Sequence, residues 1–259
     1  MATFTFTGAG LAQDSPKLKV AGLQVIRGVA GDEQNRLVPF NSFNPGTALA
    51  LLLESPAAVI KFDEMASEIE SFTDGEGTDL LVKAEGSFQN VGFGPFPKIS
   101  TDGRTVLLEI VGGGVPAAGS TSIEAKGTLS LQTASEKKVV QSQPFELVKG
   151  TPVKVGEIAL ELKRVAKPSF GDAALELEFE TSDKAVTMLA GVKFLDPEGN
   201  ELKSDSAGSS SMGFGKRYTY GRSFTLEKPV EGKVVLQFEV WTDLSEKRVP
   251  FSISAGVGG

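Results

Sequence analysis

The sequence predicts an all-β protein made of antiparallel sheets, and two observations lead to this prediction. Apolar and polar residues alternate strictly in several runs, including 128–132, 175–180 and 236–240. Alternation with a period of two is typical of a strand with one buried and one solvated face. Turn-forming pairs such as Asp102-Gly103 and Glu231-Gly232 separate the runs. Many short strands spaced by such turns favour a β-sandwich or a barrel.

One segment departs from this pattern. Between Phe62 and Phe72 the apolar residues recur at helical spacing, which favours a short helix near 62–68. The repeat described next favours a strand from about Glu68 onward.

The two halves of the chain resemble each other. A series of segments in the first half recurs in the second half in the same order. The matched segments are 47–55 with 173–181, 72–80 with 194–202, 92–94 with 213–215, 103–104 with 221–222, 135–139 with 245–249, and 144–145 with 250–251. A shared order of this kind indicates an internal duplication.

The duplication predicts two tandem antiparallel β-sandwich domains, residues 15–149 and 150–259, after an N-terminal extension strand within residues 1–14. Each copy has enough residues to bury a core of its own. The order and length of the strands resemble bacterial immunoglobulin-like or fibronectin-III-like sandwiches. The resemblance is one of architecture, because the cysteines of antibody-type domains are absent.

The composition excludes several kinds of functional site. The 259 residues include no cysteine and no histidine, which excludes disulfides, cysteine-ligated metal sites and a histidine general base. With 26 Lys and Arg against 33 Asp and Glu, the formal net charge is −7, which argues against nucleic acid as a partner. No run predicts a membrane span or a signal peptide. We therefore expect a protein that is not an enzyme.

The first candidate site is the run Ala2–Thr7, which alternates perfectly and has high β propensity. It has no counterpart before the second copy. It is either the edge strand of the first domain or a strand that pairs with a neighbouring molecule, with Phe4 and Phe6 as its apolar side chains.

The second candidate site is aromatic. The chain has two tyrosines and one tryptophan, and Tyr218, Tyr220 and Trp241 all fall in the second copy. Together with Arg217 they could form a platform for a carbohydrate or a protein. Phe93 and Phe214 each lie between two glycines, one in each copy, and this recurrence favours a core position for both.

The third candidate site is the acidic loop that contains Asp74, Glu76 and Asp79, whose oxygens alternate along a tight turn as calcium ligands do. The loop lacks the EF-hand pattern. A hairpin turn with solvated charges is the alternative, and the matching acidic turn of the second copy favours it. Apart from calcium at this loop, we expect no cofactor.

These observations favour a structural protein that assembles with itself, as an oligomer or a filament, by sheet-edge pairing through its N-terminal strand. The alternative is a module that binds carbohydrate or protein with the aromatic residues of the second domain. The compartment stays open, with an extracellular or cell-surface location slightly favoured over the cytoplasm.

Overall fold

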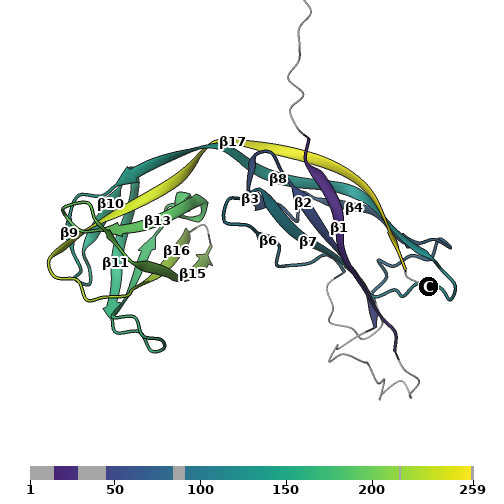
Figure 1. The fold of residues 1–259 in the computed structure, drawn as a ribbon, viewed down its shortest axis with the longest axis horizontal. Coiled ribbons are helices and arrows are strands. Elements are labelled where there is room, and N and C mark those ends of the chain that lie inside the picture. The colour runs from purple at the N-terminus through teal and green to yellow at the C-terminus, as the bar shows by residue number, and fades with distance from the viewer. Residues whose placement is uncertain (1–14, 29–44, 84–90, 216, 258–259) are drawn as a thin grey trace, which may run out of the picture. The chain divides into compact units, whose positions relative to one another are not determined.

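A computed structural model describes residues 15–28, 45–83, 91–215 and 217–257 (Figure 1). Strands account for 64% of the residues and helix for 2%, so the predicted all-β class is confirmed. In these described ranges, no helix has the length and apolar character needed to cross a bilayer.

The chain forms two compact units. Unit 1 comprises Met1–Ala134 and Leu244–Gly259, and unit 2 comprises Ser135–Asp243. The second unit is thus inserted into the first along the chain, and the predicted boundary at 149/150 lies inside unit 2. The predicted internal duplication is not confirmed.

Unit 1 contains a five-stranded antiparallel sheet of order β1-β2-β7-β5, with β6 also paired to β7. Opposite it lie β3 and β4, which both pair with β8, and the last part of β17 (Figure 1). The strands are β1 (Lys17–Ile26), β2 (Gly46–Glu54), β3 (Ala58–Phe62), β4 (Glu68–Asp74), β5 (Gly92–Phe93), β6 (Lys98–Ile99), β7 (Thr105–Gly112), β8 (Ser122–Gln141) and β17 (Lys233–Gly256).

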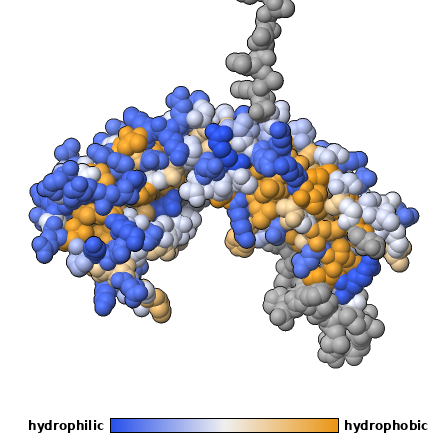
Figure 2. Space-filling view, in the orientation of Figure 1, coloured by the Kyte–Doolittle hydropathy of each residue, from blue (hydrophilic) through white to orange (hydrophobic). Residues whose placement is uncertain are grey.

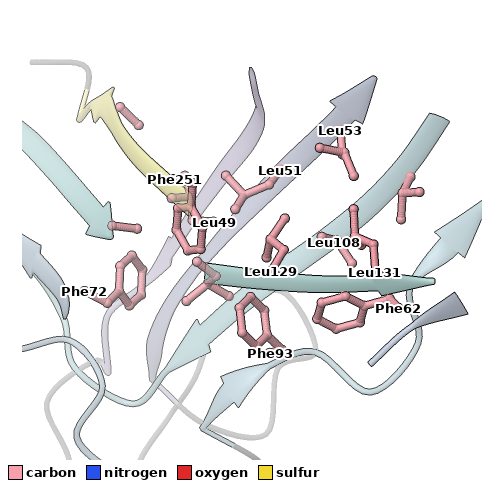
Figure 3. Packing of buried hydrophobic residues seen from close by; sticks show 14 of the residues in the cluster. Leu49, Leu51, Leu53, Phe62, Phe72, Phe93, Leu108, Leu129, Leu131 and Phe251 are labelled. Atoms are coloured by element: carbon pink, nitrogen blue, oxygen red, sulfur yellow. The ribbon is translucent and has the colours of Figure 1, made fainter. Parts of the chain in front are cut away.

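The core of unit 1 lies between these two layers (Figure 3). Leu49, Leu51 and Leu53 of β2 are fully buried at alternate positions, as the period of two requires. Phe62 and Phe93 pack edge-on with ring centroids 5.2 Å apart. The predicted core position of Phe93 is therefore correct.

The segment between β3 and β4 is a turn, so the short helix predicted near 62–68 is wrong. The Asp63 carboxylate accepts the N–H of Ala66, and the Asp63 carbonyl accepts the Ser67 hydroxyl at 2.6 Å. These bonds close a turn over only a few residues, and Phe62 and Phe72 then point into the core from two separate strands. The strand predicted from Glu68 onward is confirmed as β4.

Unit 2 contains a five-stranded antiparallel sheet of order β10-β11-β12-β16-β15. Opposite it lie β13 and β14, the last part of β8, the first part of β17, and β9, which pairs with β17. The elements are β9 (Phe145–Glu146), β10 (Pro152–Val155), β11 (Ile158–Ala166), β12 (Leu175–Thr181), the 3-10 helix η1 (Lys184–Met188), β13 (Leu189–Leu195), β14 (Glu201–Leu202), β15 (Ser204–Phe214) and β16 (Arg217–Leu226).

The core of unit 2 is rich in phenylalanine. Phe179 contacts Phe145, Phe194 and Phe224, with ring centroids 6.2 to 6.3 Å apart. Phe145 comes from the short strand β9, which follows β8, and its side chain is 8% exposed. Each unit thus has the two-layer packing of a sandwich around its own core.

Candidate functional site: an exposed hairpin of unit 2

Strands β15 and β16 form a long hairpin in which β15 carries no buried residue. Their register runs from Ser204 opposite Leu226 to Phe214 opposite Arg217. Leu226 and Phe224 are buried at the inner end, whereas every residue of β15 from Asp205 to Phe214 is exposed. The β15 sequence SDSAGSSSMGF supplies no large apolar residue to bury before Met212, so this part of the hairpin remains at the surface.

The tyrosines predicted as a binding platform lie together on this hairpin. Tyr218 and Tyr220 point to the same face of β16, and their rings stack with centroids 6.4 Å apart and an interplanar angle of 15°. Tyr220 packs against the core of unit 2, while Tyr218 is 55% exposed. Gly213 lies opposite Tyr218, and a Cβ at this glycine would come within 2.7 Å of the Tyr218 ring. The glycine therefore allows the ring to lie against the neighbouring backbone.

The opposite face of the hairpin tip is also apolar. Phe214 is 90% exposed and Met212 is 76% exposed. The prediction that Phe214 lies in the core is therefore wrong, although the matched Phe93 does lie there. The serines and glycines before Phe214 could have signalled this, because they provide no apolar neighbours for it. The exposed Arg217 lies opposite Phe214 at the turn.

Trp241 does not belong to this group. It lies on β17, in the other sheet of unit 2, three residues after the buried Phe238. By the alternation of the strand, its side chain points to the outer face of that sheet. There the Lys137 ammonium lies 4.4 Å from the centre of the indole ring and 3.5 Å from the Glu239 carboxylate. Arg217 pairs opposite Phe214 and, by the alternation of β16, points to the face away from the tyrosines. The predicted four-residue platform thus reduces to the two tyrosines.

The outer edge of β15 has no partner strand among the residues that the structure describes. Its eleven residues include no lysine, arginine or proline, which are the residues that natural proteins use to protect sheet edges. A single bulge between Ser206 and Gly208 interrupts its register. The edge therefore presents a row of backbone donors and acceptors that another strand could pair with.

A small cavity lies near the base of the hairpin. Its volume is about 190 Å³, and Leu189, Asp205 and Arg222 are among its lining residues. The guanidinium of Arg222 donates to the Val186 carbonyl at 2.9 Å, and burial lowers the pKa of Arg222. Sites for small molecules usually have volumes of about 300 Å³ or more. The cavity is therefore too small to define a ligand site by itself.

The acidic loop of unit 1 is a hairpin turn organised by one buried carboxylate. Asp74 is 3% exposed. One of its oxygens accepts the N–H groups of Glu76 at 3.0 Å and Thr78 at 2.7 Å, and the other accepts that of Ala117 at 2.7 Å. Burial raises the pKa of Asp74, but these hydrogen bonds outweigh burial, and the net result is a pKa below the ordinary value.

The calcium prediction concerned the same turn. The Asp79 carboxylate accepts the N–H of Leu81 at 2.9 Å, and Glu76 is exposed. Within the ranges that the structure covers, no three acidic side chains are grouped closely enough to hold a metal ion. Asp74 uses its oxygens to fix the backbone of the turn.

Phe4 and Phe6, predicted as an assembly strand, lie outside the described residues. Comparison of this chain with protein-family models, with curated proteins and with solved structures finds no match.

Proposed function

We propose that this protein is a non-enzymatic structural protein that assembles with copies of itself through pairing of β-sheet edges. The observation that carries the proposal is the edge of β15. It is long, fully exposed from Asp205 onward and free of protecting charges apart from Asp205 itself. Edges of this kind readily accept another strand.

A second copy of the chain is the partner that fits this edge best. Two β15 strands can pair antiparallel around a twofold axis, each offering the same surface to the other. Asp205 at the start of one strand then lies toward the hairpin turn of the other copy, where Arg217 is exposed. The exposed side chains of Met212 and Phe214 become available for burial against the partner.

The N-terminal strand remains part of this proposal. The alternation of Ala2–Thr7 suits it to pair with a sheet edge, with Phe4 and Phe6 on one face. Deletion of residues 2–7 is expected to abolish self-association and to leave both units folded. If the deletion variant still assembles, this strand is not the connector.

The edge of β15 is tested by a double substitution, Ser210→Lys with Met212→Lys. Both side chains are exposed and lie on the face of β15 away from the tyrosines. Added charges disfavour edge-to-edge pairing, so we expect loss of assembly by light scattering and negative-stain electron microscopy. Folding stability should change by less than about 0.5 kcal/mol.

The matched control is Met65→Lys with Thr101→Lys, which adds the same charges at exposed turn positions of unit 1. The control should assemble as the unmodified protein does. A β15 variant that assembles normally would remove this edge from the proposal. If the unmodified protein remains a monomer at high concentration, the proposal of self-assembly itself fails.

A second candidate function is binding of a carbohydrate or a protein at the stacked tyrosines, and their parallel rings on an exposed hairpin favour it. Tyr218→Ala is the informative change, because Tyr220 also packs against the core. Loss of binding in a glycan or protein screen with unchanged stability would support this function. Unchanged binding would exclude Tyr218 from it.

A further inference from the structure

The last segment of the chain completes the unit that the first half of the chain begins. Ser135–Asp243 forms unit 2, whereas Leu244–Gly259 belongs to unit 1. We call the described part, residues 244–257, the C-terminal segment. The chain therefore leaves unit 1 after Ala134, builds unit 2, and returns to close unit 1.

The C-terminal segment contributes directly to the core of unit 1. Phe251 and Ala255 are each 8% exposed and belong to the same buried cluster as Leu49 and Leu129 (Figure 3). Further apolar side chains of the segment pack against this cluster at the same alternating spacing, namely those of Val249, Ile253 and Val257. One face of the segment is therefore apolar from Val249 to Val257.

The segment is also held by pairing with β8. The Val257 N–H donates to the Thr121 carbonyl at 2.9 Å, and the hydroxyls of Thr133 and Ser245 lie 2.9 Å apart. Between these two pairs, Gly127 makes room for the Phe251 ring, since a Cβ there would come within 3.0 Å of it. Unit 1 thus presents a site shaped for this segment.

The joint before the segment has an unusual backbone. Asp243 has a φ of 53°, and it is the one non-glycine residue with positive φ in the part of the chain that the structure describes. The hydroxyl of Ser135 donates to its carboxylate. Such a conformation is unfavourable for most residues with a side chain, although aspartate adopts it more readily than most, and the residues that follow, Leu244 to Glu246, are exposed. Asp243 lies within β17, at the boundary between the two units, and is therefore the candidate hinge.

We propose that the C-terminal segment of one copy can occupy its site in unit 1 of a second copy, so that molecules join by strand exchange. An exchanged segment makes the same contacts as before, so only the hinge and the protein concentration distinguish the two states. Extension of the chain at Asp243 relieves its backbone strain, which favours exchange. The inference rests on the proposed self-assembly and names a third connecting segment for it, after the edge of β15 and the N-terminal strand.

The test uses single cysteines, because the natural chain has none. One variant carries Thr133→Cys, and the other carries Ser245→Cys together with a tag that changes its mass. Their parent hydroxyls lie 2.9 Å apart, and Thr133 is only 1% exposed, which limits random disulfide formation. The two variants are unfolded together, refolded at high protein concentration and oxidised.

Strand exchange places Cys at position 133 of one chain against Cys at position 245 of the other. We expect a disulfide-linked band with the summed mass of the tagged and untagged chains on a non-reducing gel. The band should grow with the protein concentration during refolding and disappear on reduction.

The matched control is the pair Gln141→Cys and Gln237→Cys. Their side-chain amides are hydrogen-bonded at 2.7 Å, and both residues lie in unit 2, before the hinge. This mixture should give no mixed band. Equal bands in both mixtures, or none in the first, would overturn exchange at this hinge.

Light scattering of the unmodified protein separates this result from the wider proposal. Assembly without the mixed band removes strand exchange and leaves edge pairing in place. If the unmodified protein is a monomer and the mixed band is also absent, both strand exchange and edge pairing are excluded.

Two hinge variants give a further measurement. Asp243→Gly accepts the positive φ and should decrease the mixed band, whereas Asp243→Val disfavours it and should increase the band. If both variants leave the band unchanged, Asp243 is not the hinge.

Discussion

Phe145 and Phe251 follow matching prolines in the two halves of the chain, yet each lies in a core built mainly by the opposite half. Phe145 packs in unit 2 and Phe251 packs in unit 1, and both are 8% exposed. The local sequence therefore determines that each ring is buried. It does not determine which core receives the ring, because two similar segments can each complete a similar sandwich.

A second comparison concerns two matched turns. Asp74 and Asp196 each accept, through the side chain, the N–H of the residue four positions later, and Gly77 and Gly199 adopt φ values of 84° and 91°. The two turns differ in surroundings. Asp74 is buried and also holds Ala117, whereas Asp196 is more exposed and is held by the Asn200 side chain.

The comparison of Phe145 with Phe251 gives the largest expected effects. Phe251→Ala should lower the free energy of unfolding of unit 1 by about 3–5 kcal/mol, and Phe145→Ala should do the same for unit 2. Trp241 is the single tryptophan and lies in unit 2. The denaturant concentration at the midpoint of unfolding, followed by the fluorescence of Trp241, should fall for Phe145→Ala and stay unchanged for Phe251→Ala.

Far-ultraviolet circular dichroism should detect the loss in both of these variants. Phe170→Ala, at a residue that is 92% exposed, serves as the control. If Phe251→Ala lowers the tryptophan midpoint as much as Phe145→Ala, the two units do not unfold independently.

Replacement of the matched phenylalanines Phe93 and Phe214 with alanine should have very different effects on the free energy of unfolding. Phe93→Ala removes a ring from the core of unit 1 and should cost about 3 kcal/mol or more of stability. Phe214→Ala should change stability by less than about 0.5 kcal/mol, because its side chain is 90% exposed. Urea unfolding measures both, and a large cost at Phe214 would contradict the exposed hairpin.

From the lowered pKa values of Asp74 and Asp196 we expect the protein to lose stability in acid. Both have a pKa below the ordinary 3.8, so each stabilises the folded state above that pH. This stabilisation is lost as the pH falls below about 4 toward the folded-state values. The Asn200 side-chain amide lowers the pKa of Asp196, and backbone N–H groups, including that of Ala117, lower the pKa of Asp74 against the effect of burial.

Asp74→Asn should therefore reduce stability at neutral pH more than Asp196→Asn, and should remove more of the loss between pH 4 and pH 2. Unfolding measured across this pH range tests both statements. Equal effects of the two substitutions would show that the additional bond to Ala117 contributes little.

Addition of a calcium chelator should give the smallest effect. Because the Asp74 carboxylate is occupied by backbone N–H groups, we expect no change in the melting temperature. A clear decrease would instead assign calcium to this turn, since a ligand bound to the folded state raises its stability.

Strands and turns could be predicted from the sequence, because they depend on periodicity and turn chemistry, which are local properties. The alternation at 175–180 predicts strand β12, and the Asp-Gly and Asp-Pro-Glu-Gly turns lie where they were expected. The helical spacing between Phe62 and Phe72 was misleading, because two strands joined by a short turn bury the same residues. The exposure of Phe214 was missed because a phenylalanine between glycines is buried only if neighbouring strands supply a core.

The sequence by itself thus determined the all-β class, most strand positions and the aspartate turns, since these depend on residues close together in the chain. Only the tertiary structure decided that the C-terminal segment closes unit 1, that Trp241 lies apart from the tyrosines, and that β15 is an open edge. These features depend on which distant segments pair. Similar alternating strands can pair in more than one way, so their partners are selected by the packing of the whole unit.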